Sequence, residues 1–169
     1  MKLIFKFLFG LALLFTTLQA EEPKTDPQYL PINIDLALSY LRDNRWYFVG
    51  SSDSNLVFFD TKTAEYDKKT KILTGWSVWF YTPYGREQYI QKAKEFNFYN
   101  SYKDDNLSYS IQKERWSLSS NRWMILNYAD YSTEGSVVHQ STYKNPEWDE
   151  ILPNSIGEEM FENLKKRYR

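Results

Sequence analysis

The sequence predicts an α+β fold: an antiparallel β-sheet of about six strands with a C-terminal α-helix packed on it. Three observations lead to this prediction. Short runs rich in aromatic and β-branched residues are separated by turn clusters, as expected for strands joined by hairpins. Residues 73–81 place large side chains alternately on two faces, as in a sheet. The chain closes with the apolar spacing of an amphipathic helix.

The first elements of the predicted domain are a short helix and a hairpin. Residues 33–44 have enough apolar contacts for a helix, and Asp35 is its expected cap. Residues 46–49 and 56–59 are apolar runs on either side of a Gly-Ser-Ser-Asp-Ser-Asn turn cluster. This order predicts strand, turn and strand.

The strand at residues 73–81 is expected to be central in the sheet. Trp76 and Phe80 fall on one face, while Trp79 and Tyr81 fall on the other. Because both faces carry aromatic side chains, we expect one to lie on the core and the other to be partly covered.

The following segment has two interpretations. Residues 86–96 have apolar positions at helical spacing, which fits either a surface helix or an ordered loop. Residues 107–118 and 123–131 are then predicted strands. Gly135 gives a tight turn in which glycine adopts a positive φ, and residues 136–141 pair back.

The C-terminal helix has a clear start signal. Ser155 and Glu158 form a predicted capping box, in which each side chain accepts a hydrogen bond from a free N–H group of the first turn. The apolar stripe along this helix consists of Ile156, Met160, Phe161, Leu164 and Tyr168. We therefore expect the helix to pack on the sheet.

The N-terminus predicts export. Lys2 and Lys6 precede a short apolar run at residues 7–15, and a small residue, Ala20, marks the expected cleavage site. The alternative is a membrane anchor, but spanning a bilayer takes about 20 apolar residues. We predict a signal peptide at residues 1–20, with no transmembrane segment left after its cleavage.

Two further segments complete the predicted organisation. Residues 21–32 form a flexible leader with three prolines, and residues 33–169 form a single domain. Cleavage would leave 149 of the 169 residues. A chain of this size buries enough surface to fold without disulfides.

Composition excludes several function classes. The chain has no cysteine, which removes thiol nucleophiles, cysteine metal sites and a lipid anchor at the signal cleavage site. Loss of the two signal lysines changes the formal charge from −1 to −3. A chain without net positive charge does not favour nucleic-acid binding.

We assign no catalytic, cofactor-binding or metal-binding residue from the sequence. His139 is the only histidine, and it occupies an ordinary position in a strand-like run. The adjacent acids Asp104 and Asp105 are expected to be solvated turn residues, as are the other acidic pairs in the chain. Catalytic carboxylates in glycosidases typically flank a cleft instead.

The second half of the chain contains the runs Trp116-Ser-Leu118 and Trp123-Met-Ile-Leu126, and the block from Trp148 to Ser155 precedes the closing helix. With these residues it resembles the surface-adhesin protein E family, whose members are mostly small exported bacterial proteins. The resemblance covers roughly residues 44–168, and its most specific part is the block W-D-E-I-L-P-N-S at residues 148–155. The residues that carry this structural motif are Trp116, Trp123, Tyr131, Gly135, Trp148, Ile151, Pro153 and Ser155.

The resemblance implies an antiparallel sheet with a docked terminal helix, and a place in the periplasm or on the cell surface of a Gram-negative bacterium. It also implies adhesion to host matrix proteins, as in the best-known member. Two family features are absent. The family often ties its sheet to the terminal helix by a disulfide, for which the expected counterparts here are Ser119 or Ser120 and a position near Lys165. The adhesin is lipid-anchored, and this chain has no cysteine to modify.

Three functions therefore remain open. The first is a non-enzymatic, adhesin-like envelope protein that binds a host matrix protein or an envelope protein, without a cofactor. The second is a periplasmic enzyme that acts on glycan or peptide through carboxylates. The third is a structural envelope subunit that assembles through an edge strand. The oligomeric state is left open.

Overall fold

The computed structural model describes residues 27–168, apart from the side chain of Tyr102. The predicted signal peptide and the first part of the predicted leader lie outside these residues. The rest of the leader contains a 3-10 turn, η1 (Pro27–Tyr29). The backbone N–H of Ile32 then donates a hydrogen bond to the carbonyl oxygen of Tyr81, with an N···O distance of 2.9 Å. The chain thus contacts the sheet before its first long helix begins.

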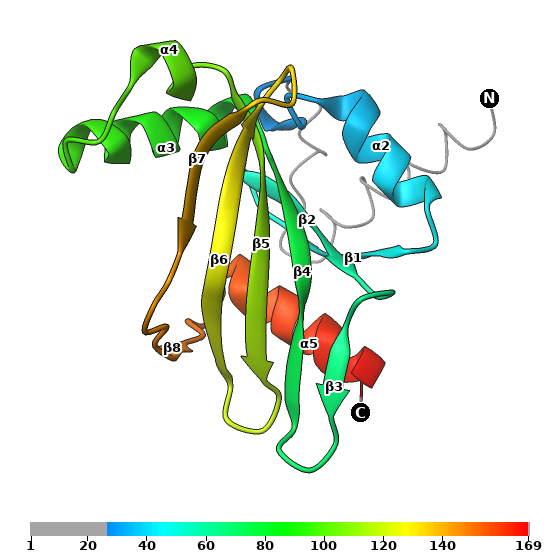
Figure 1. The fold of residues 1–169 in the computed structure, drawn as a ribbon. Coiled ribbons are helices and arrows are strands. Elements are labelled where there is room, and N and C mark those ends of the chain that lie inside the picture. Colours follow the sequence, from blue (N-terminus) through cyan, green and yellow to red (C-terminus); the bar gives the residue numbers. More distant parts are fainter. Residues whose placement is uncertain (1–26, 169) are drawn as a thin grey trace.

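Within the described residues, antiparallel strands form one sheet whose six main strands run in the order β1-β2-β4-β5-β6-β7 (Figure 1). Two short strands are added, β3 beside β4 and β8 beside β6. The strands are β1 (Trp46–Ser51), β2 (Asn55–Asp60), β3 (Glu65–Asp67), β4 (Ile72–Tyr81), β5 (Leu107–Ser117), β6 (Arg122–Ser132), β7 (Val137–Thr142) and β8 (Asp149–Glu150). The predicted α+β fold with an antiparallel sheet of about six strands is confirmed.

The α-helices of the described chain are α2 (Ile34–Arg42), α3 (Pro83–Glu95), α4 (Ser101–Asp104) and α5 (Ile156–Tyr168). Figure 1 shows α2, α3 and α4 near one end of the sheet, whereas α5 lies across the sheet behind the strands. The segment at residues 86–96, which the sequence left open between helix and loop, is mostly α3. Thr82 caps this helix, because its Oγ1 accepts a hydrogen bond from the N–H of Gly85 at 3.0 Å.

Two capping predictions need correction. Asn33 caps α2 in place of the predicted Asp35, with its Oδ1 accepting from the N–H of Leu36 at 3.1 Å. Asp35 lies one residue inside the helix, where only its charge favours the N-terminus. One of the two hydrogen bonds of the predicted α5 capping box is present, and the other has a different donor. Ser155 Oγ accepts from the N–H of Glu158 at 3.2 Å, whereas Glu158 accepts from the N–H of Asn154 instead of Ser155.

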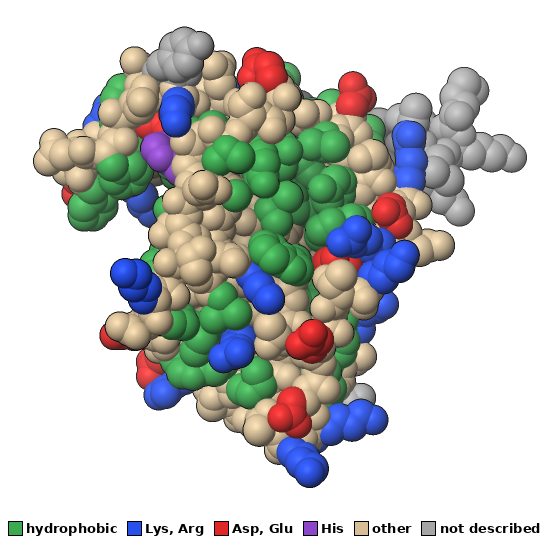
Figure 2. All heavy atoms as spheres, viewed as in Figure 1, with side chains coloured by type: hydrophobic (Ala, Val, Ile, Leu, Met, Phe, Trp, Pro, Cys, Tyr) green, Lys and Arg blue, Asp and Glu red, His purple; other side chains and the backbone are tan. Residues whose placement is uncertain are grey.

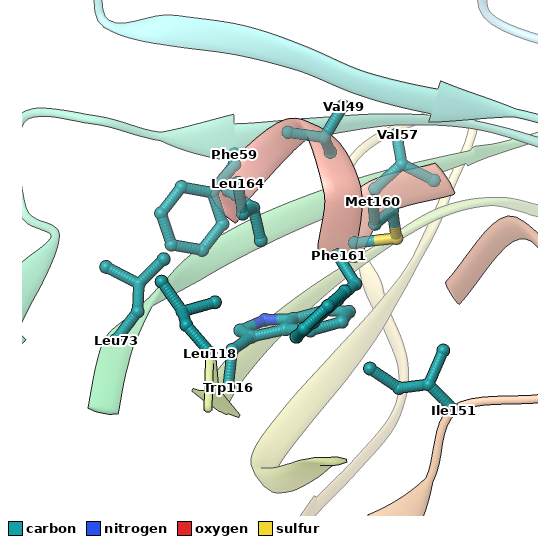
Figure 3. Close-up of a cluster of buried hydrophobic side chains, with 10 residues drawn as sticks. All are labelled: Val49, Val57, Phe59, Leu73, Trp116, Leu118, Ile151, Met160, Phe161 and Leu164. Atoms are coloured by element: carbon teal, nitrogen blue, oxygen red, sulfur yellow. The ribbon is translucent and has the colours of Figure 1, made fainter. Parts of the chain in front are cut away.

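One face of the sheet packs against α5, and we call it the α5 face. Its core contains Trp116 from β5 and Leu73 from β4, both fully buried, together with Met160, Phe161 and Leu164 from the helix (Figure 3). The predicted apolar stripe is therefore the packing surface of α5. Burial of such side chains contributes about 1.5–3 kcal/mol each, which explains how the helix docks without a disulfide.

The opposite face, which we call the α2 face, carries a second core. Val78 and Phe80 of β4 and Phe58 of β2 lie under Ala37 of α2, and all four are at most 1 % exposed. Tyr40 of α2 packs edge-on against Phe80, with 5.2 Å between ring centroids. Strand β4 is central and covered on both faces, as its two rows of aromatic residues predicted.

Candidate functional site

The α2 face contains a hollow beside the part that α2 covers. Its volume is about 470 Å³, and it lies over β4, β5, β6 and β7. The side chains that characterise it come from four strands: Trp76, Ile111, Asn127, Tyr131, Gln140 and Thr142. Figure 2, drawn from the side opposite α5, shows hydrophobic side chains gathered over the middle of the molecule. We call this region the sheet hollow.

Strand register explains why these residues meet. Trp76 lies opposite Lys113 across β4 and β5, and Lys113 lies opposite Asn127 across β5 and β6. Asn127 is in turn opposite Thr142 on β7. Gln140 lies two residues before Thr142 on that strand, so the two side chains are on the same face. Cross-strand neighbours on one face have Cβ atoms about 5 Å apart, so these four strands form a continuous row of side chains.

The lining of the sheet hollow combines aromatic and aliphatic residues with uncharged polar residues. The Tyr131 ring is stacked on that of Tyr109, with centroids 4.9 Å apart and planes 6° from parallel. No charged side chain of the described chain lines the hollow. The nearest cation to its tryptophan is Lys113, whose Nζ lies 5.7 Å from the centroid of the Trp76 ring. Such a surface suits an uncharged ligand with both apolar and polar groups.

Asn127 has an unsatisfied acceptor in this lining. Its Oδ1 is shielded from solvent and has no hydrogen-bond partner among the described residues. A buried carbonyl oxygen without a partner costs about 1–3 kcal/mol, and because this oxygen is shielded, a hydroxyl group in the hollow does not reach it in this structure.

A second cluster lies where α3 and α4 meet β6 and β7. We call His139, Asp104, Asp130 and Tyr89 the histidine cluster. His139 Nε2 and Asp104 Oδ1 are 2.5 Å apart, and Asp104 is fully buried. The other carboxylate oxygen of Asp104 accepts from the N–H of Asn100 at 2.6 Å. The expectation that Asp104 is a solvated turn residue is wrong, since Asp104 ends α4 with its side chain fully buried against His139 of β7.

Burial changes the pKa values of two groups in the histidine cluster. Burial raises the pKa of Asp130 to about 6, although a hydrogen bond from Ser110 and the positive charge of His139 oppose the shift. Burial, followed by the negative charge of Asp130, also raises the pKa of Tyr89. The cluster holds α4 to β7 through the bond between Asp104 and His139.

Another ionisable group, Glu114, lies outside the histidine cluster and is enclosed on the α5 face. It is fully buried, and burial raises the pKa of its carboxyl group to about 7 against the polar side chains around it. One carboxyl oxygen accepts a hydrogen bond from Trp116 Nε1 at 3.1 Å, while the other has no partner in the described chain. Enclosure within the core gives Glu114 a structural role.

The residues of the predicted motif do not form one site. Trp116 and Trp123 contact each other in the α5 core, with ring centroids 5.4 Å apart, and Ile151 joins them there. Tyr131 alone lines the sheet hollow. The remaining motif residues lie in the turn between β6 and β7 (Gly135, φ 79°), in the loop around β8 (Trp148 and Pro153) and at the start of α5 (Ser155).

Sequence reasoning did not single out the residues that line the sheet hollow. Trp76 is visible as part of an alternating strand, but Asn127 and Gln140 have no motif of their own. The signal that could have found them is the pairing of three strands, because only that pairing places their side chains beside Trp76.

Within residues 27–168, no group of three or more His, Asp or Glu side chains could hold a metal ion. No helix in that range is both long and apolar enough to cross a membrane.

The fold and the hollow define a class: an α+β protein with a C-terminal helix on one sheet face and an open hollow on the other. No family model matches the chain, and no curated protein matches its sequence. One similar solved structure is that of Haemophilus influenzae protein E. It has a TM-score of 0.45 and 8 % sequence identity, over 75 % of this chain and 87 % of that chain.

Proposed function

We propose that the protein is a non-enzymatic, exported cell-envelope protein that binds a partner through the sheet hollow. The observation that carries this proposal is the open hollow on the α2 face, lined by aromatic and uncharged polar side chains from four strands. Binding surfaces typically combine aromatic anchors with a few polar groups that orient the partner.

The N-terminal pattern and the family resemblance support the location. A predicted signal peptide would deliver the domain to the periplasm or the cell surface, and its cysteine-free sequence leaves no lipid anchor at the cleavage site. Resemblance to the surface-adhesin protein E family favours an adhesin-like role. The partner would be a host matrix protein or an envelope protein.

The buried acids do not favour an enzyme that uses the sheet hollow. Asp104 and Asp130 are close to His139, but neither lines the hollow, and Asp104 is committed to His139 and Asn100. Glu114 is enclosed in the α5 core. A glycosidase pair would instead flank the surface where the substrate lies.

Two measurements test the proposal. Fractionation with protease treatment of intact cells locates the protein, and we expect it outside the cytoplasm. The purified protein is then tested on immobilised fibronectin and collagen IV, and on isolated cell envelopes. We expect saturable binding that Gln140→Leu weakens. Gln91→Leu, at an exposed position on α3, is the matched control and should leave binding unchanged. A cytoplasmic location, or equal binding by both variants, would contradict the proposal.

A further inference from the structure

We infer that the ligand held in the sheet hollow is a neutral saccharide. This inference rests on the proposed function and adds the chemical class of the bound group. Its basis is the pairing of an aromatic side with an amide and hydroxyl side in one uncharged hollow.

The aromatic side suits the apolar face of a sugar ring. Trp76 and Tyr131 line the hollow from β4 and β6, with Ile111 of the intervening strand β5 also in its lining. The C–H groups on one face of a pyranose ring pack on aromatic rings, because the electron-rich ring face attracts them weakly. The ammonium group of Lys113 contacts one face of the Trp76 ring and helps to fix the position of the ring.

The polar side suits the hydroxyl groups at the edge of the same ring. Gln140 and Thr142 of β7 are exposed, and an amide or a hydroxyl can both donate to and accept from a sugar hydroxyl. Asn127 adds an amide to the lining, with its Oδ1 shielded from solvent. A sugar hydroxyl is both donor and acceptor, so it can bond to the amide of Gln140 and to the hydroxyl of Thr142.

Other ligand classes fit less well. An acyl chain would leave the amide and hydroxyl groups without partners, which is costly once they are buried. An anionic ligand would find no cation among the lining residues, and the ammonium group of Lys113, beside the hollow, lies over the Trp76 ring. A peptide that extended the sheet would pair with the outer edge of β7, beside the hollow and not over it, since the backbone groups of β5 and β6 already pair within the sheet.

The size of the hollow agrees with a small ligand. Pockets for small molecules have volumes of roughly 300–1,000 Å³, and this hollow has about 470 Å³. It opens to solvent on one side, so a chain of sugar residues can extend beyond it.

The test uses the full chain, expressed and purified, with named saccharides. Maltotriose, cellotriose and triacetylchitotriose are the neutral probes, and a heparin disaccharide and decanoate are the charged and acyl probes. Saturation-transfer NMR detects contact, and calorimetry gives the affinity. We expect at least one neutral probe to bind. Binding should weaken by about fivefold or more in Gln140→Leu, as expected for the loss of one hydrogen bond.

Matched variants separate the hollow from general effects. Trp76→Leu should weaken binding, whereas Trp148→Leu, in the loop before β8, should not. Thermal unfolding of each variant shows whether it is folded. The inference is overturned if no neutral probe binds, if only heparin or decanoate binds, or if the hollow variants bind as well as their controls.

A further arm separates this inference from the proposed function. Fibronectin is presented before and after enzymatic removal of its glycans. Binding that Gln140→Leu weakens but deglycosylation does not would keep the proposed function and overturn the saccharide inference. Binding that is lost on deglycosylation and that a free neutral probe displaces supports both. Absence of binding to every surface and every probe overturns both.

Discussion

Glu114 is a carboxylic acid that the fold encloses completely. Burial raises the pKa of its carboxyl group from 4.5 to about 7, so the folded protein holds a proton that the unfolded chain has released. Stability from this group is therefore fully present below about pH 4.5 and is lost as pH rises towards 7. The loss amounts to about 3 kcal/mol for a shift of this size.

The substitution Glu114→Gln tests this effect. Glutamine has the same shape without the charge, so the variant should match the wild type at pH 4.5 and exceed its unfolding free energy at pH 8. Urea denaturation at both pH values measures the difference. Asp130→Asn is the comparison, because burial raises the pKa of Asp130 in the same direction, to about 6. Equal destabilisation by Glu114→Gln at both pH values would contradict this account.

The bond between Asp104 and His139 makes a second prediction at this scale. His139→Ala leaves one oxygen of a fully buried carboxylate without its partner. We expect a loss of about 1–3 kcal/mol of unfolding free energy, which is the cost of an unpaired buried acceptor. A double-mutant cycle with Asp104→Asn measures the coupling, and additive effects would show that the pair does not interact.

At the scale of the element, α5 is attached to the sheet by its buried apolar side chains, with hydrogen bonds from Asn163 to Val49 and from Ser51 to Glu159 at the β1 edge. Leu164 is fully buried against the α5 face, while Glu162 is exposed and makes only a surface ion pair with Lys165 at 3.6 Å. We expect Leu164→Ala to cost about 2–5 kcal/mol, and the matched variant Glu162→Ala to change stability by less than about 0.5 kcal/mol. Urea denaturation measures both. Similar values for the two variants would mean that the helix is not docked as described.

At the scale of the whole molecule, both edges of the sheet carry side-chain hydrogen bonds. Asn163 Nδ2 of α5 donates to the carbonyl oxygen of Val49 on β1 at 3.0 Å. Lys103 Nζ contacts the carbonyl oxygen of Val138 on β7 at 3.4 Å. Groups of this kind block edge-to-edge pairing, so they oppose assembly through an edge strand.

We therefore expect the protein to be a monomer in solution, even at high concentration. Sedimentation equilibrium over a wide concentration range measures this. Concentration-dependent dimers that Lys103→Ala strengthens would show that β7 is a pairing edge held closed by this contact. Stable oligomers in the unmodified protein would instead favour the structural-subunit hypothesis.

Much of the fold follows from the sequence, whereas the candidate site does not. The strands, the turn at Gly135 and the apolar stripe of α5 follow from local patterns, because alternation and helical spacing depend on near neighbours in the chain. The cap at Asn33 was missed, since Asn33 and Asp35 are both good capping residues. The sheet hollow and the buried Asp104 were missed because their contacts join residues from different elements.

The sequence by itself determined the α+β class, the docking face of α5 and the expectation of export. Each depends on residue type and spacing within one segment, where the physics is local. Only the tertiary structure decided which side chains share a surface. Strand order and register brought Trp76, Asn127 and Gln140 together, and the packing of α4 on β7 buried Asp104 against His139. A binding surface made across four strands depends on that pairing, which no single segment of this sequence encodes.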